Sequence, residues 1–405
     1  MESFAKSIKG LGMQPTDIVS TNTSYMLMDF ALGGGISEGQ WIEIFGAEGV
    51  GKTSNALCMS SYFLEIMDNM YLMYLDIEKA TAYERITEVF FQDDVKIDEE
   101  TGVIFINGKE RGILSSPDTF EQIDAAFDAF AKYCKKNELH GIIVWDSLVT
   151  AVSEKVIKDG KEKLAYRATM IQDIIDKYGT VFSKIPITQL VINQTRQKIK
   201  INMFESSKGD GEMADDVALP GGNAHKFKAF QTLFLARGKK WEFPTTTPFL
   251  EGRTIRFLPT KNKLGAPKRE FKMVLIYEIG FSSLVSLLEY LRDKKLLKGQ
   301  GLSSIKYGKM KTGMKLDKFA DKVSTDEKFA KEFFDYMFDI LITDFKAYAK
   351  LHRFNKDDML KALMWDAKKV VTVFNDLKGK GVDVDVSEDA DVNEDSDIES
   401  EEETK

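Results

Sequence analysis

The chain is poor in the residues that build disulfide frameworks and metal centres. Its 405 residues include only two cysteines, Cys58 and Cys134, and three histidines, His140, His225 and His352, with no ligand-like spacing between them. A disulfide scaffold and a zinc-type centre are therefore excluded, and a reducing compartment is indicated. No apolar run approaches the roughly 18 residues that a membrane-spanning helix needs, and no signal-peptide pattern is present. We expect a soluble, intracellular protein.

An excess of positive charge, which nucleic-acid-binding proteins usually carry, is also missing. The formal net charge is −8 at pH 7. Its distribution changes the picture: residues 381–405 hold 12 Asp and Glu and one Lys, whereas the rest of the chain holds 52 acidic and 55 basic residues, a net charge of about +3. We expect a mildly basic body and a disordered acidic tail at 381–405. An interacting or autoinhibitory tail and a merely solubilising one remain alternatives.

The most informative pattern that is present is a GxxxxGKT segment at residues 46–53. It follows an alternating apolar run at 41–45 and precedes residues 55–70, where apolar side chains recur at helical spacing. Strand, glycine-rich turn and helix form the context of a phosphate-binding P-loop, in which backbone N–H groups and the helix N-terminus bind the anion. We expect Lys52 to reach the β- and γ-phosphates and Thr53 to bind Mg²⁺. The residues predicted to hold the nucleotide are Gly46, Ala47, Glu48, Gly49, Val50, Gly51, Lys52, Thr53 and Ser54.

Two buried strands are each predicted to end in an acidic residue. The apolar run at 71–75 is followed by Asp76 and Glu78, and the run at 141–145 is followed by Asp146. In open α/β sheets ligands bind at the carboxyl ends of parallel strands. Asp146 therefore fits the Mg²⁺ shell beside Thr53, and an acid at 76–78 could orient water for attack on a γ-phosphate. A helix cap or a surface acid at 76–78 is the alternative.

Changes of pattern along the chain suggest four parts. We expect an oligomerisation arm at 1–24, which could equally be a frayed terminus, an α/β ATPase core at 25–285, a mainly helical domain at 286–380, and the tail at 381–405. Residues 92–112 are typical of a β-hairpin with Asn107 and Gly108 at its turn. The sequence also predicts a helix at 25–32, strands at 187–192 and 231–236, and an antiparallel pair of strands at 253–259 and 272–277. The stretch 197–219 has no sustained apolar period and reads as a long, functional or disordered loop.

Two motifs that bracket this loop carry a family resemblance. Residues 193–199 read NQTRQKI and residues 221–227 read GGNAHKF. With GAEGVGKT, LDIE, SSPDTFEQ at 115–122, IIVWDS, LAYRATM at 164–170 and KNKLGAP at 261–267, they occur in the order of the RecA family of strand-exchange recombinases. The chain resembles this family over roughly residues 25–280, and its short N-terminus resembles the bacteriophage members. The resemblance implies a RecA-type α/β fold with a mostly parallel central sheet.

The resemblance also implies roles for residues around the nucleotide. Glu78 matches the catalytic glutamate that positions the attacking water, and Gln194 matches the glutamine that senses the γ-phosphate; Lys52 completes the catalytic set. Tyr83 resembles the adenine-stacking tyrosine, although it follows Glu78 by two residues fewer than is usual. A lysine pair is implied to reach ATP on the adjacent subunit: Lys261 and Lys263.

A second group of residues is implied to bind DNA. Arg167 matches a DNA-contacting arginine after the first loop, and Ile199 matches an apolar wedge between bases. The other matches in or beside the second loop are Arg196, Lys198, Gly221, Gly222 and Asn223. The loop departs from the family because 197–219 contains five acidic residues against three lysines.

The resemblance implies an ATP- and Mg²⁺-dependent, DNA-stimulated ATPase that forms helical filaments on single-stranded DNA. It would catalyse homologous pairing and strand exchange in recombination and repair. Its expected partners are single-stranded and homologous duplex DNA, further copies of itself, a single-strand-binding protein and a loading mediator, in the cytoplasm of a bacterial cell and encoded by the cell or a phage. The alternatives are a hexameric helicase with the same core and an ATP-gated recombination mediator that lacks strand exchange.

Overall fold

The computed structural model describes residues 19–90, 94–154, 164–197, 217–218, 220–221, 224–242, 251–298 and 301–379. The predictions for most of the arm at 1–24, for most of the loop at 197–219 and for the tail at 381–405 lie outside these residues. Within them, no helix is long and apolar enough to cross a bilayer.

The centre of the described structure is one mixed 11-stranded sheet, ordered β15-β14-β13-β12-β3-β9-β8-β4-β7-β6-β5. Its middle strands, from β12 to β7, run parallel, and both ends are extended by antiparallel strands. The four central parallel strands β3, β9, β8 and β4 are almost wholly buried, as expected when both faces are covered. The strands are β3 (Trp41–Gly46), β4 (Met70–Asp76), β5 (Val95–Ile97), β6 (Val103–Ile106), β7 (Lys109–Ser115), β8 (His140–Asp146), β9 (Ile187–Gln194), β12 (Gln231–Glu242), β13 (Glu251–Asn262), β14 (Phe271–Ile276) and β15 (Gly280–Ser282).

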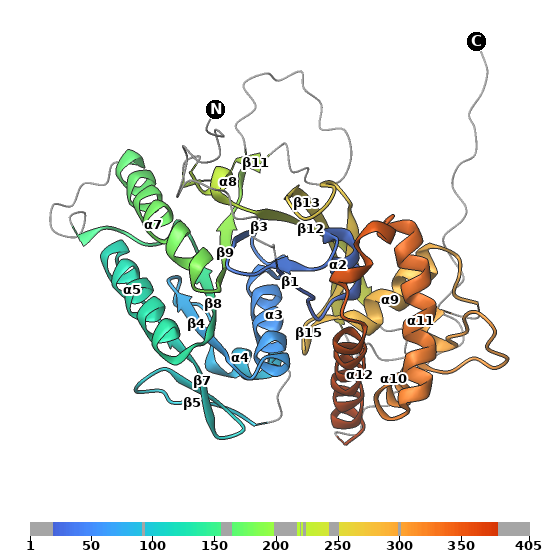
Figure 1. Cartoon of the computed structure of the whole chain (residues 1–405). Coiled ribbons are helices and arrows are strands. Elements are labelled where there is room, and N and C mark those ends of the chain that lie inside the picture. The colour runs from blue at the N-terminus through green and yellow to red at the C-terminus, as the bar shows by residue number, and fades with distance from the viewer. Residues whose placement is uncertain are drawn as a thin grey trace, which may run out of the picture.

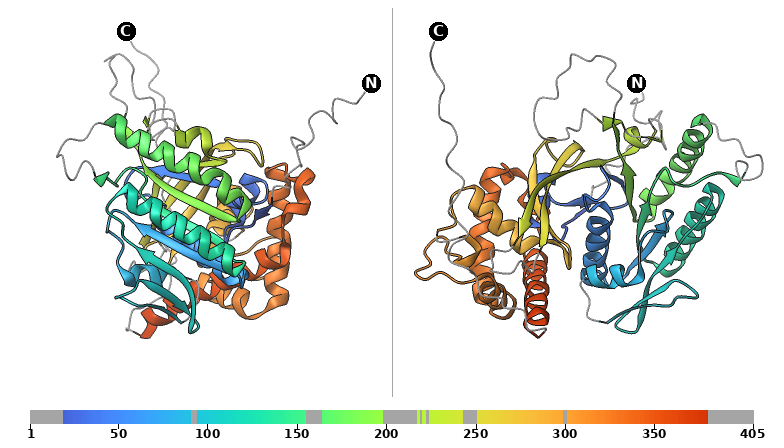
Figure 2. Two further views of the ribbon diagram at one scale, coloured as in Figure 1. Left: turned by 60° about the vertical axis from the view of Figure 1, so that its left-hand side comes forward. Right: turned by 180° about the vertical axis from the view of Figure 1, so that it is seen from behind.

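Helices cover the two faces of the sheet, and alternate strand residues point to each face. Helices α5 (Phe120–Asn137) and α7 (Leu164–Lys184) pack side by side on one face (Figures 1 and 2), where they meet residues such as Met73, Ile143 and Val191. On the other face α3 (Lys52–Ile66) meets the neighbours of those residues, among them Leu72 and Ile142. Helix α4 (Tyr83–Val89) packs beside α3. This alternation is the period of two that a strand imposes on its side chains.

Several predicted elements are present with small shifts in their bounds. The hairpin between β6 and β7 turns at Asn107 and Gly108, which both have positive φ, as a two-residue hairpin turn requires. Helix α2 (Met26–Leu32) ends at Gly33, whose left-handed conformation terminates it. The helix after the P-loop starts at Lys52, three residues before the predicted start, because the left-handed Gly51 ends the loop there. The strands that the sequence placed at 253–259 and 272–277 pair antiparallel as β13 and β14.

The region after β15 is helical, as predicted, and it packs closely on the core. It contains α9 (Ser283–Asp293), η2 (Gly301–Ser303), α10 (Leu316–Thr325), α11 (Glu327–Asp344), η3 (Tyr348–Arg353) and α12 (Lys356–Gly379), on the side of the molecule away from α5 and α7 (Figure 1). One continuous apolar cluster joins these helices to α2 and α3. Phe30 of α2, for example, stacks on Phe354 with ring centroids 4.5 Å apart. The domain boundary at 286 stays a prediction.

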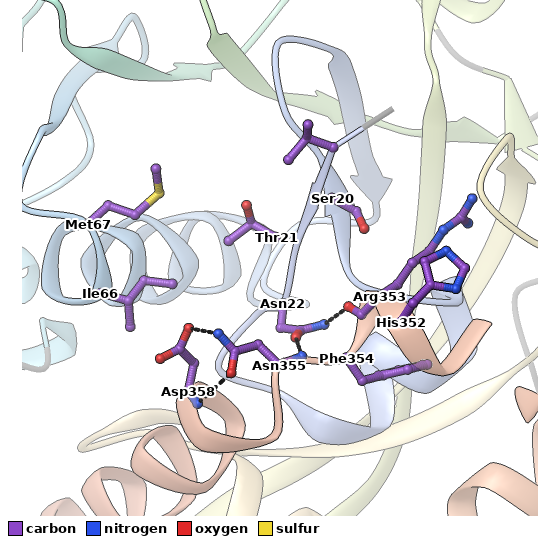
Figure 3. A pocket seen from close by; sticks show the side chains of 11 residues that line it. Ser20, Thr21, Asn22, Ile66, Met67, His352, Arg353, Phe354, Asn355 and Asp358 are labelled. Carbon is purple, nitrogen blue, oxygen red and sulfur yellow. Dashed lines mark hydrogen bonds between the residues drawn. The ribbon is translucent and has the colours of Figure 1, made fainter. Parts of the chain in front are cut away.

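A cavity of about 610 Å³ lies at the junction between this helical region and the core (Figure 3). It is lined by β1 (Ser20–Thr21), which pairs with β2 (Ile36–Ser37), by the C-terminal end of α3, and by residues 352–358. Asn22 holds its two sides together, because its side chain bonds to the backbone of both Arg353 and Asn355. The P-loop lies at the other end of α3, about 20 Å away for a helix of this length. The cavity is therefore separate from the predicted nucleotide site.

Candidate nucleotide-binding site

The segment between β3 and α3 has the backbone geometry of an anion-binding loop. Gly49 and Gly51 have φ of +71° and +80°, a left-handed conformation that glycine adopts without strain. A Cβ on Gly51 would also come within 2.9 Å of Leu275 and 3.0 Å of Phe281. The first turn of α3 has no side-chain cap, so its N–H groups are available to an anion. Lys52 is buried and folds back over the loop, where its Nζ donates to the carbonyls of Gly46 (3.1 Å) and Ala47 (2.6 Å).

The structure brings together the two residues predicted to bind Mg²⁺. Thr53 on α3 donates through Oγ1 to Oδ2 of Asp146, the last residue of β8, at 2.5 Å. Burial raises the pKa of Asp146 to about 7; the hydrogen bond from Thr53 opposes this, and the neighbouring Glu78 and Asp76 raise the pKa further. A buried carboxyl group whose ionised form is disfavoured, as in Asp146, is stabilised in that form by a bound cation.

Glu78 and Gln194, which the sequence separates by more than a hundred residues, are in direct contact. Gln194 Nε2 donates to Glu78 Oε1 at 2.7 Å, and the hydroxyl of Ser147, just after Asp146, donates to the same oxygen at 2.6 Å. Three adjacent parallel strands, β4, β8 and β9, end here, so the contact follows from the strand order. The carboxylate of Asp76 accepts a hydrogen bond from the backbone N–H of Thr81 at 3.0 Å, so it stabilises the segment that follows β4.

The chain is similar to known proteins over most of its length. A family model described as the RecA N-terminal domain matches residues 2–282. The chain belongs to the RecA family. It is similar to the protein RecA of Mycoplasma mobile, 28% identical over 306 residues that cover 74% of this chain and 82% of the relative. The protein RecA of Deinococcus radiodurans is 27% identical over 325 residues, 78% of this chain and 79% of the relative. That of Geobacter metallireducens is 27% identical over 288 residues, 70% and 75%.

This RecA-family chain has a second aromatic residue near the predicted adenine site that the sequence reasoning missed. Tyr83, at the start of α4, and Tyr277, after β14, are 38% and 46% exposed. Arg85 links their surroundings, because it donates to the carbonyl of Tyr277 (2.8 Å) and to the hydroxyl of Ser54 in the first turn of α3 (3.3 Å). Arg85 of α4 therefore connects the backbone at Tyr277 to the first turn of the helix that follows the P-loop. A tyrosine just beyond a strand in the sheet's antiparallel wing carries no sequence signal of its own.

The two lysines predicted to reach a neighbouring subunit differ from each other in their surroundings. Lys261 is half-buried, and its Nζ donates to the carbonyls of Lys226 and Phe227 at the end of the short helix α8 (Ala224–Lys228). Lys263 is exposed and lies over the ring of Phe230, 5.4 Å from its centroid. Phe227 is 80% exposed, the largest exposed fraction among the large apolar side chains of the described residues. Lys261 thus contacts the backbone of the exposed Phe227, and Lys263 packs against the buried ring of Phe230.

The predicted DNA-binding residues are only partly described. Residues 196–197 (β10) pair antiparallel with 217–218 (β11), which closes the second loop on a short stem. Lys198, Ile199, Gly222 and Asn223 lie outside the described residues. Gly221 has a φ of +99°, and Arg167 donates to the carbonyl of Val149 at 2.5 Å, so it points toward the segment that follows β8.

Two further features of the site were not predicted. Arg237 of β12 donates to the carbonyl of Glu48 at 2.6 Å and thereby holds the tip of the P-loop. Glu43, in the middle of β3, is fully buried beside His225, with Glu43 Oε1 2.9 Å from His225 Nδ1. A charged residue inside an apolar strand motif was the only signal for Glu43, and nothing in the sequence indicated its partner.

The donor set suits a nucleoside triphosphate with Mg²⁺. Uncapped N–H groups at the start of α3 and in the glycine turn can donate hydrogen bonds to the oxygens of a polyphosphate. Lys52 supplies a positive charge beside it. One hydroxyl and one carboxylate, from Thr53 and Asp146, are few ligands for a metal held by protein alone, but they match Mg²⁺, which keeps waters and phosphate oxygens in its shell.

Proposed function

We propose that this protein is an ATP-dependent DNA recombinase that assembles as a helical filament on single-stranded DNA and catalyses homologous pairing and strand exchange. The observation that carries the proposal is the 2.7 Å contact between Gln194 and Glu78. Gln194 ends β9 and leads within two residues into the stem of the second loop, so one short segment touches both the water-positioning acid and the DNA-binding loop. A change at the γ-phosphate therefore has a direct route to that loop.

The catalytic roles follow from this geometry. Glu78 would orient and deprotonate the attacking water, Lys52 would balance phosphate charge, and Gln194 would report whether the γ-phosphate is present. Mg²⁺ held by Thr53 and Asp146 would supply charge neutralisation on the transferring phosphate. The P-loop backbone from Gly46 to Ser54 would hold the polyphosphate, with the base between Tyr83 and Tyr277.

DNA would bind through the second loop and Arg167, mainly by phosphate contacts that are independent of sequence and weaken with salt. Homologous recognition would then rest on base pairing between the bound strand and a duplex. Arg196, Lys198, Ile199 and the Gly221–Gly222–Asn223 turn are the proposed contacts.

Self-association is supported by the surface beside Lys261 and Lys263. An 80% exposed phenylalanine, Phe227, is costly to leave in water and is typical of a subunit contact. A neighbour bound there would bring its nucleotide toward the lysine pair, so that ATP would lie between subunits. A single-strand-binding protein and a loading mediator are further proposed partners, and a bacterial cytoplasm, with or without a phage origin, is the proposed location.

Electron microscopy of the full chain with single-stranded DNA and a slowly hydrolysed ATP analogue tests the proposal, with ADP as the matched control. We expect continuous helical fibres with the analogue and short or no fibres with ADP. Strand exchange between a circular single strand and a homologous linear duplex should accompany the fibres. Closed rings with unwinding of forked DNA would support a hexameric helicase instead, and DNA binding without strand exchange would support a mediator.

A further inference from the structure

Three buried polar side chains meet beneath the stem of the second loop. Glu43 of β3, Asn193 of β9 and His225 of α8, which we call the root cluster, are each 0% exposed. Asn193 Nδ2 donates to Glu43 Oε1 at 2.9 Å, and His225 Nδ1 lies 2.9 Å from the same oxygen. Asn193 Nδ2 also donates to the carbonyl of Pro220 at 3.2 Å.

The root cluster is an expensive arrangement for a protein interior. Buried polar groups cost free energy unless they are fully hydrogen-bonded. Within the described residues, Glu43 Oε2, Asn193 Oδ1 and both ring nitrogens of His225 have no hydrogen-bond partner. The 2.9 Å approach of His225 Nδ1 to Glu43 Oε1 is therefore a close polar contact and not a well-aligned hydrogen bond. Because several of its atoms lack a hydrogen-bond partner, the root cluster is a poor source of stability. Its position in the fold indicates another role.

The position of the root cluster suggests this role. Glu43 lies three residues before Gly46, the first residue of the P-loop, and Asn193 immediately precedes Gln194. Pro220, which Asn193 also holds, starts the turn that leads from the second loop into α8. The root cluster thus joins the P-loop strand, the γ-phosphate-sensing strand end and the C-terminal end of the DNA loop. On the far side of α8, Lys261 binds its last carbonyls and restrains the helix from β13.

We propose that His225 is a positioning residue that, through Glu43 and Asn193, fixes the end of the second loop to the P-loop strand and transmits the nucleotide state to single-stranded DNA binding. The inference rests on the proposed function. The close approach of an imidazole nitrogen to a buried carboxylate favours one register of α8 against β3, and an apolar side chain would lack this preference. Glu43 Oε2 and the two nitrogens of His225, which have no hydrogen-bond partner within the described residues, allow a different pairing within the root cluster when Gln194 moves, as a two-state element requires.

The test compares four full-length variants with the wild type. His225→Leu replaces the imidazole with an apolar side chain, His225→Asn keeps a donor near the place of Nδ1, and Glu43→Gln exchanges the carboxyl group for an amide of nearly the same shape. The matched control is His140→Leu, because His140 also lies beside a glutamate, with Nδ1 3.5 Å from Glu38 Oε2, but at the opposite end of β8 from Asp146.

The measured quantity is the ratio of dissociation constants for a fluorescein-labelled thymidine oligonucleotide with ADP and with a slowly hydrolysed ATP analogue, at one salt concentration. We expect His225→Leu to lower this ratio about tenfold, a coupling loss of about 1.4 kcal/mol. His225→Asn should recover it to within about threefold of wild type, and Glu43→Gln should lower it about threefold. His140→Leu should leave it unchanged, and affinity for the ATP analogue without DNA should stay within about twofold in all variants.

Other outcomes would contradict either the positioning role of His225 or the proposed function. An unchanged ratio in His225→Leu and Glu43→Gln overturns the positioning role, and so does a fall matched by an equal loss of ATP-analogue affinity, which indicates general damage to the fold. If His225→Leu does not fold, Glu43→Gln and His225→Asn decide the question alone. A wild type whose DNA affinity is the same with ADP and the analogue overturns the proposed function itself.

Discussion

At the scale of single residues, Glu78 is the side chain whose role the geometry defines most sharply. Its Oε1 accepts hydrogen bonds from Gln194 and from Ser147, so a neutral side chain of the same shape can keep its place. An amide can still orient water by hydrogen bonding, but it cannot take a proton. Binding and turnover should therefore separate at this position.

We expect Glu78→Gln to lower the DNA-stimulated turnover number for ATP at least 100-fold, the size typical of a lost general base. Its affinity for single-stranded DNA in the presence of a slowly hydrolysed ATP analogue should stay within about threefold of wild type. Glu84→Gln, an exposed acid on α4, is the control and should turn over normally. Equal loss of DNA affinity and turnover in Glu78→Gln would refute the assigned role.

Asp29 gives a prediction about pH at the same scale. It is fully buried, Oδ1 accepts from the backbone N–H and the hydroxyl of Thr23 (2.7 and 2.8 Å), and Oδ2 has no partner within the described residues. Burial raises the pKa of Asp29 well above its usual value, against the two bonds from Thr23. The folded state therefore binds this proton more tightly than the unfolded state, and that stabilisation is complete below the unfolded pKa of about 3.9 and is lost as pH rises toward the folded pKa.

Asp29→Asn removes this titration. Any constant cost of the substitution is the same at every pH, so the informative quantity is the slope: relative to wild type, the variant's urea midpoint should rise between pH 4 and pH 7. Asp376→Asn, an exposed acid near the end of α12, should track the wild type throughout. Parallel curves for Asp29→Asn and wild type would show that Asp29 titrates normally in the folded protein.

At the scale of elements, α12 is tied to the start of α9 by one carboxylate. Asp366 of α12 is buried, and its Oδ2 accepts the backbone N–H of Leu284 (2.7 Å) and the hydroxyl of Ser282 (2.8 Å). A helix at one end of the chain therefore caps a helix that leaves the sheet. Because the two regions also share one apolar cluster, we expect the helical region and the core to unfold together.

Asp366→Ala should lower the free energy of unfolding by about 2 kcal/mol, because two buried donors lose their acceptor. The transition, followed by circular dichroism in urea, should stay single and shift to lower urea. Asp376→Ala, on an exposed face of the same helix, should shift it by less than about 0.5 kcal/mol. Two separate transitions in the wild type would instead show that the region after 286 is an independent domain.

The elements differ in how far their sequences determine them. The parallel strands β3, β4, β8 and β9 are short apolar runs with a clear end, and their patterns predict them to within two residues. Strand β12 extends to Glu242, six residues beyond its predicted end. The prediction stopped too early because a bulge between Arg237 and Lys240 breaks the alternation of apolar and polar residues. Exposed lysines in that segment resemble a loop until the partner strand β13 is known.

At the scale of the whole molecule, the sequence predicts the motifs of the site but not the contacts between them. Thr53 with Asp146 could be anticipated, since both belong to patterns with known partners. The root cluster could not, because Glu43, Asn193 and His225 come from three segments and meet only once the strand order is set. The contacts of Arg237 with Glu48 and of Tyr277 with Arg85 could not be predicted either, because they join β12 and the segment after β14 to the P-loop side of the sheet.

The charge distribution gives the last prediction. The tail after residue 382 holds twelve acidic residues, whereas the rest of the chain has a net charge of about +3. We therefore expect the tail to compete with DNA phosphates for basic side chains of the protein. Removal of residues 383–405 should tighten binding of a single-stranded oligonucleotide several-fold at about 0.1 M salt, where the Debye length is about 10 Å. The difference should nearly vanish at about 1 M, where that length is about 3 Å.

The control for this truncation keeps the length of the tail and removes only its charge, by replacing its Asp and Glu with Asn and Gln. If charge competition is the cause, the neutral tail and the truncation should tighten DNA binding equally, and both should leave the affinity for the ATP analogue without DNA unchanged. Tightening by truncation alone would indicate steric exclusion. If neither change alters DNA affinity at about 0.1 M salt, the tail only solubilises the protein. Salt weakens charge effects, so a tail without effect at low ionic strength has none at higher ionic strength.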